Sequence, residues 1–200
     1  MINHLIVNAY PRSGSVFFAK FLQEYRPDIM YLTSMHVPHI IDNKHLNSVV
    51  IFRDPYECMS SHLYMMVNPF DADIFDIDNK PLINSIEKNI SQYDAYIDIF
   101  LENTDKRFIY GVLFDKMTSD PHNVAIDIFK KFNLEYDRTI HNSSVEVESN
   151  LIQNNEMDDK GGHMPRPKTK ERLVIENFVS TLDILKNSFE KYKIVKDLLT

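Results

Sequence analysis

The stretch Ala9-Tyr10-Pro11-Arg12-Ser13-Gly14-Ser15-Val16-Phe17-Phe18 (AYPRSGSVFF) follows directly on a short apolar run and decides the fold. Residues 3–8 have the composition of a buried strand, and the apolar residues of 17–25 recur with helical spacing. The polar stretch between them is therefore a turn from a strand into a helix. The first amides of a helix lack partners within the helix, so together with its dipole they attract an anion.

The side chains of this turn suit a phosphate group. Gly14 permits close approach of a ligand, Ser13 and Ser15 add hydroxyl donors, and Arg12 adds a permanent positive charge. The Gly-Lys-Ser/Thr pattern of a triphosphate loop is absent, which counts against ATP or GTP. A plain turn with a serine cap is the alternative interpretation of the same residues.

Strands and helices continue to alternate along the chain. Such alternation predicts a three-layer α/β/α fold with a central, mainly parallel sheet. Further strands are expected at 29–32, 49–52 and 108–114, and helices after 54, over 83–100, over 121–132 and from about 169 into the 190s. We expect one domain over residues 1–200, with a mobile loop at about 137–168.

Four candidate groups each follow a predicted strand: the quoted turn, His36, Arg53 and Phe114. The carboxyl ends of parallel strands meet at one edge of the sheet, where ligands collect. We therefore expect these groups to converge.

Arg53 ends a strand that is predicted to be buried on both faces, and an arginine there needs an anionic partner. Ser61 lies about two helical turns further on, so both residues could bind a second phosphate. The alternative is that Arg53 pairs with Asp54 or Glu57, and that Ser61 is merely exposed. Asp54 is predicted to cap the helix that follows.

Composition limits the partners. The net charge of −7 disfavours nucleic acid, and the short apolar runs leave no expected membrane span. The single cysteine, Cys58, is predicted to be buried in a helix and fits a reducing, cytoplasmic compartment. His36 and His39 lack further ligands at metal spacing, so no metal site is predicted. The C-terminal helix is expected to pack on the core and could support a homodimer.

Five motifs resemble those of the sulfotransferases, in the family's order over residues 5–165. Residues 10–15 resemble the 5′-phosphosulfate loop Tyr-Pro-Lys-Ser-Gly-Thr-Thr-Trp, and residues 50–61 are similar to the 3′-phosphate motif. Residues 34–38 resemble Lys-Thr-His-Leu-Pro, which contains the catalytic base. Residues 113–121 look like Tyr-Glu-Asp-Leu-Lys…Asp-Pro, and residues 160–165 resemble the Lys-Gly cofactor loop.

The resemblance implies a P-loop nucleoside triphosphate hydrolase-like fold and the donor 3′-phosphoadenosine-5′-phosphosulfate (PAPS), with PAP as product and no metal. By position, Phe17 and Phe114 would lie against the adenine. The 5′ end would be held by Arg12, Ser13, Gly14, Ser15 and Val16, and the 3′-phosphate by Arg53, Ser61, Lys160 and Gly161.

The resemblance also implies a mechanism in which His36 takes a proton from a hydroxyl or amine of a small-molecule acceptor. Arg12 would stabilise the charge on the bridging and leaving oxygens. Two other classes stay open. One is a P-loop small-molecule kinase; the other is a non-catalytic adenine-nucleotide binding module, which Val16 and Ser34, at positions of a family threonine and lysine, would permit.

Overall fold

The computed structural model describes residues 4–10, 13–33, 38, 46–66, 75–103, 106–136 and 170–200. Within these residues the centre of the fold is a four-stranded sheet, built from β1 (His4–Ala9), β2 (Met30–Thr33), β3 (Ser48–Phe52) and β4 (Ile109–Leu113). The strand order is β2-β1-β3-β4, and all three pairings are parallel. The predicted parallel sheet is confirmed.

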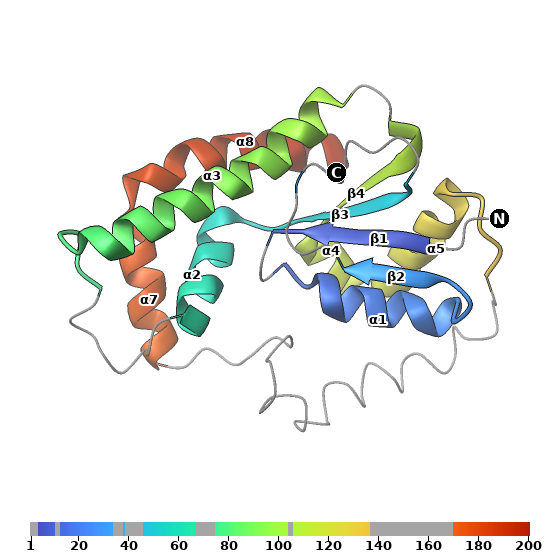
Figure 1. Cartoon of the computed structure of the whole chain (residues 1–200), viewed down its shortest axis with the longest axis horizontal. Coiled ribbons are helices and arrows are strands. Elements are labelled where there is room, and N and C mark those ends of the chain that lie inside the picture. Colours follow the sequence, from blue (N-terminus) through green and yellow to red (C-terminus); the bar gives the residue numbers. More distant parts are fainter. Residues whose placement is uncertain are drawn as a thin grey trace.

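Helices cover both faces of the sheet, as Figure 1 shows. On one face lie α1 (Ser15–Tyr25) and α5 (Pro121–Lys131); on the other lie α3 (Lys80–Glu102) and α8 (Lys186–Leu199). Neighbouring side chains of β3 alternate between the two cores: Val49 and Ile51 pack with α1 and α5, whereas Val50 and Phe52 pack with α3 and α8. Burial on both faces explains why β3 is continuously apolar. The fold is the predicted three-layer α/β/α architecture.

A helical lobe extends beyond the end of the sheet. Here α2 (Pro55–Met66) lies beside α7 (Lys170–Ser180), and the first half of α3 packs against both (Figure 1). A separate apolar core holds the lobe together: Met59, Leu63, Ile86, Ile175 and Val179 are all buried. The isoleucine-rich face of α3 therefore belongs to the core.

The topology leaves a ligand position between two strand ends. From β1 the chain passes through α1 to β2 on one side, whereas from β3 it continues to β4 on the other side. β1 and β3 are neighbours in the sheet, but the chain leaves their ends in opposite directions. In open parallel sheets such a switch point forms the ligand crevice.

The C-terminal helix differs from the single helix expected from about 169 into the 190s. The chain forms α7, then a 3₁₀ turn η6 (Asp183–Leu185), then α8. The break falls where Ser180 and Thr181 donate their hydroxyls to the carbonyls of Asn177 and Phe178. Such local bonds compete with helix continuation, and the break lets α7 pack on α2 while α8 packs on α3.

The predicted loop at 137–168 lies outside the described residues. Among the helices that are described, none is long and apolar enough to cross a membrane.

Candidate anion-binding site

The turn after β1 presents the start of α1. Gly14 occupies the position before the helix with φ 79° and ψ 14°, a left-handed conformation that favours glycine. Its carbonyl accepts from the Phe18 amide, so the helix begins directly after it. No described side chain caps this end of α1, and its first turn carries no acidic residue. The amides of Ser15, Val16 and Phe17 therefore have the orientation that an anion requires.

Side chains of α2 and α3 support this turn from the protein interior. Ser13 Oγ lies 3.2 Å from Cys58 Sγ on α2, and either atom can donate. The buried ring of Tyr10 packs edge-on against Tyr93 of α3, with 5.4 Å between the ring centroids. Its centroid lies 6.4 Å from that of the His62 ring of α2. Burial raises the pKa of Cys58 to about 12, so it holds Ser13 as a neutral thiol. The turn is thus fixed to the beginning of α2.

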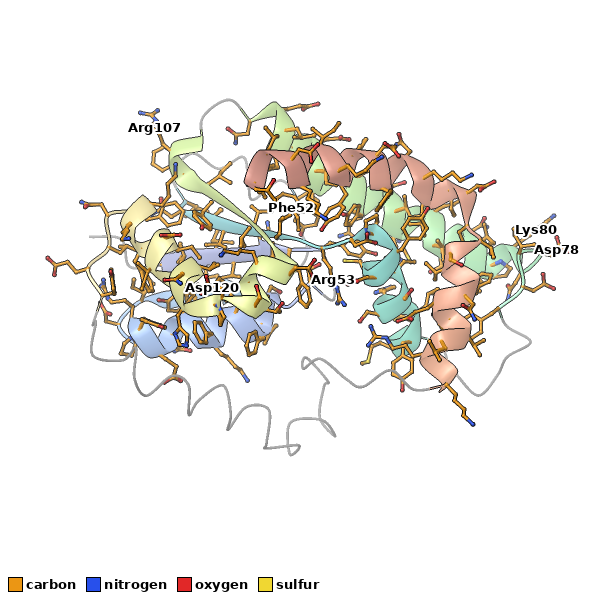
Figure 2. The ribbon with its side chains drawn as sticks, turned by 180° about the vertical axis from the view of Figure 1, so that it is seen from behind. Phe52, Arg53, Asp78, Lys80, Arg107 and Asp120 are labelled. Carbon is orange, nitrogen blue, oxygen red and sulfur yellow. The ribbon has the colours of Figure 1, made fainter. Side chains whose placement is uncertain are left out.

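Arg53 lies at the end of β3, where the chain enters α2 (Figure 2). Only 13% of its side chain is exposed. Its Nε donates to Glu57 Oε2 at 3.1 Å, and its guanidinium carbon lies 4.2 Å from the centroid of the Phe114 ring. The alternative interpretation of Arg53, a pairing with Asp54 or Glu57, is therefore confirmed for Glu57. The guanidinium of Arg53 is therefore held by Glu57 at its Nε and by Phe114 on one face.

The start of α2 completes this wall of the site. Asp54 caps the helix as predicted, since its Oδ1 accepts from the amides of Tyr56 at 2.8 Å and Glu57 at 3.3 Å. Burial is the main cause that raises the pKa of Asp54. Ser61 is half-buried and lies one helical turn after Glu57. Because residues four apart share a helix face, Ser61 lies on the same side of α2 as the partner of Arg53.

Phe114 connects the two halves of the site. It opens the short helix α4 (Phe114–Ser119) directly after β4. A Cβ atom built on Gly14 would lie 3.1 Å from Phe114 Cε2 and 3.0 Å from Met117 Cε. The Arg53 guanidinium lies over the same Phe114 ring. One aromatic ring thus lies close to both the turn after β1 and Arg53, and the expected convergence is found for these residues.

The other predicted site residues do not all fall within the described structure. Phe17 is half-buried and stacks on Phe21 of the same helix. Arg12, His36, Lys160 and Gly161 lie outside the described residues, so their roles stay predictions. Within the described ranges no group of three His, Cys, Asp or Glu side chains is arranged to hold a metal ion.

Three contributors were assigned no role in the site from the sequence: Cys58, Tyr93 and His62. Cys58 was expected only to be buried, and its contact with Ser13 depends on how α2 lies against the turn. Tyr93 donates its hydroxyl to the Arg53 carbonyl at 2.7 Å, but in sequence it is one of many apolar positions on α3. By contrast, the Arg53–Glu57 contact could be expected from the sequence, because the two residues are four apart.

Comparison with known proteins identifies the fold. No protein-family model and no curated protein sequence matches the chain. Among solved structures, the chain is similar to the crystal structure of mouse sulfotransferase SULT7A1 complexed with PAP. The match has a TM-score of 0.51 and 11% sequence identity, and it covers 100% of this chain and 86% of the mouse chain. The three-layer, all-parallel α/β fold is therefore one that a sulfotransferase also adopts.

Proposed function

We propose that this protein is a sulfotransferase that moves a sulfuryl group from PAPS to a hydroxyl or amine of a small-molecule acceptor. One observation carries the proposal. The turn at Gly14 and the guanidinium of Arg53 both lie next to the Phe114 ring, at the switch point of a parallel sheet. The fold shared with a PAP-bound sulfotransferase supports the same conclusion.

The chemistry of the site fits a ligand with two separate anionic groups. The amides of Ser15, Val16 and Phe17 would bind the 5′ end, as helix N-termini bind phosphate. Arg53 would bind the 3′-phosphate, since its planar guanidinium suits that group. Ser61, on the face of α2 nearest to Glu57, would add a hydroxyl donor. A nucleoside triphosphate carries its phosphates in one chain and makes no such use of Arg53.

The bound donor would supply an activated sulfuryl group. The protein would position the donor and the acceptor and neutralise the negative charge of the reacting groups. His36 would take the proton from the acceptor, since a neutral imidazole is an effective base near pH 7. Arg12 would stabilise negative charge on the leaving oxygen without transferring a proton, because arginine stays protonated. These two roles rest on the motifs of residues 10–15 and 34–38.

Calorimetric titration of the protein with PAP, in the absence of magnesium, tests the proposal. We expect PAP to bind more tightly than ATP with or without magnesium. Arg53→Ala should weaken PAP about 10–100-fold, the range of a hydrogen bond to a charged group. Arg107→Ala is the matched control. Arg107 is exposed and precedes β4, so it lies at the amino ends of the strands, whereas Arg53 lies at the carboxyl ends (Figure 2). We expect the Arg107→Ala variant to bind PAP with the affinity of the wild type.

Two results would lead to the other classes. Tighter binding of ATP with magnesium than of PAP would favour a small-molecule kinase. Binding of PAP without turnover of labelled PAPS on any acceptor, and without an effect of His36→Ala, would favour a binding module.

A further inference from the structure

We infer that Phe114 is a positioning residue for Arg53, and through it a determinant of selectivity for a 3′-phosphate, rather than a residue that stacks on the adenine. The inference rests on the proposed function and deepens it. It also revises the role that the resemblance implies for position 114.

The contacts of Phe114 are made to the protein itself. The Arg53 guanidinium lies over one face of the ring, with 4.2 Å between the guanidinium carbon and the ring centroid. The Cε2 edge of the ring lies 3.1 Å from the position that a Cβ atom on Gly14 would occupy. The half-buried ring also packs on the apolar core beneath α1 and α5. A base that stacked on the guanidinium-bearing face would have to displace Arg53.

Two contacts together fix the guanidinium. The cation–π contact with Phe114 restrains the position of the group over the ring, and the bond from Nε to Glu57 Oε2 at 3.1 Å restrains its orientation. The Nη groups, which complete the planar donor set, are then directed by the geometry of the protein and not by the ligand. A preordered arginine loses less side-chain freedom when it binds an anion, so affinity for that anion rises.

This role differs measurably from adenine stacking. If Phe114 orders Arg53, its loss weakens ligands that carry a 3′-phosphate more than ligands that lack one. If Phe114 stacks on the base, its loss weakens every adenosine nucleotide to the same degree. PAP and 5′-AMP share the adenine and the 5′-phosphate and differ at the 3′ position, so this pair of ligands separates the two roles.

The test is titration of PAP and 5′-AMP into wild type, Phe114→Leu and Phe114→Tyr, with folding verified by circular dichroism. Phe114→Leu should weaken PAP about 3–30-fold, the range of a cation–π contact, and weaken AMP clearly less. Phe114→Tyr keeps the ring and should bind both ligands like the wild type. Phe114→Met, which fills similar volume without a ring, replaces Phe114→Leu if that variant does not fold.

A double variant adds a second measurement. In the Arg53→Ala background, Phe114→Leu should cause no further loss of PAP affinity, because the two residues act as one unit. Equal weakening of PAP and AMP, or fully additive losses in the double variant, would overturn the inference while leaving the proposed function intact. Failure of the wild type to bind PAP would instead contradict the proposed function.

Discussion

Replacing Gly14 by alanine probes the backbone geometry on which the anion site depends. Gly14 has φ 79°, and an L-residue with a Cβ pays about 1–2 kcal/mol in this region. The new Cβ would lie 3.0 Å from Met117 Cε and 3.1 Å from Phe114 Cε2. Met117 can move its terminal methyl, but Phe114 is held beneath Arg53.

We therefore expect Gly14→Ala to lower the free energy of unfolding by about 2 kcal/mol, combining backbone strain with crowding. For a chain of this size each kcal/mol corresponds to about 2–4 °C, so the melting temperature should fall by about 4–8 °C. Urea unfolding gives the free energy, and PAP titration gives the affinity, which should fall about tenfold or more if the turn relaxes away from the left-handed region.

Gly14→Asn is the matched control, since asparagine tolerates the left-handed region but still introduces a Cβ. It should be more stable than Gly14→Ala. Wild-type stability and PAP affinity in Gly14→Ala would refute the assigned geometry of the turn, and equal losses in both variants would refute backbone strain as the cause.

The remaining predictions concern α2. Asp54→Ala should destabilise the protein by about 1 kcal/mol because two capped amides lose their acceptor, whereas Asp54→Asn, which can still cap, should change urea stability little. Cys58 is the single cysteine, is 1% exposed and has a pKa raised by burial to about 12. A thiol reagent at pH 8 should therefore label it only after unfolding. Labelling of the folded protein at the rate of a free thiol would contradict its burial. Glu57→Gln keeps an acceptor for Arg53 but removes a negative charge near the bound anion, so calorimetry should show PAP binding about two- to fivefold tighter. Glu87→Gln, at an exposed position of α3, is the control. Weaker PAP binding by Glu57→Gln would show that the charge of Glu57 supports the site.

Local sequence patterns predicted most of the architecture. The apolar run at 49–52 identified a strand buried on both faces, and the Asp54-Pro55 pair identified the start of α2. Because parallel strands share one carboxyl edge, the rule that places ligands there also predicted that the turn at Gly14, Arg53 and Phe114 would meet. That prediction needed only the order of elements along the chain.

Contacts between side chains of different elements were beyond such patterns. The cation–π contact of Arg53 with Phe114 depends on the pairing of β3 with β4, and the Ser13–Cys58 contact depends on how α2 lies against the turn. Neither leaves a periodic signal. The break between α7 and α8 was missed for a similar reason, since it lacks both glycine and proline and follows from bonds made by Ser180 and Thr181.

The central claim is that one bisphosphorylated adenosine bridges the turn after β1 and the end of β3. A crystal structure of the protein with PAP tests it most directly. We expect the 5′-phosphate on the amides of Ser15, Val16 and Phe17, and the 3′-phosphate on the guanidinium of Arg53. PAP bound with neither phosphate at these groups, or bound elsewhere on the molecule, would contradict the claim.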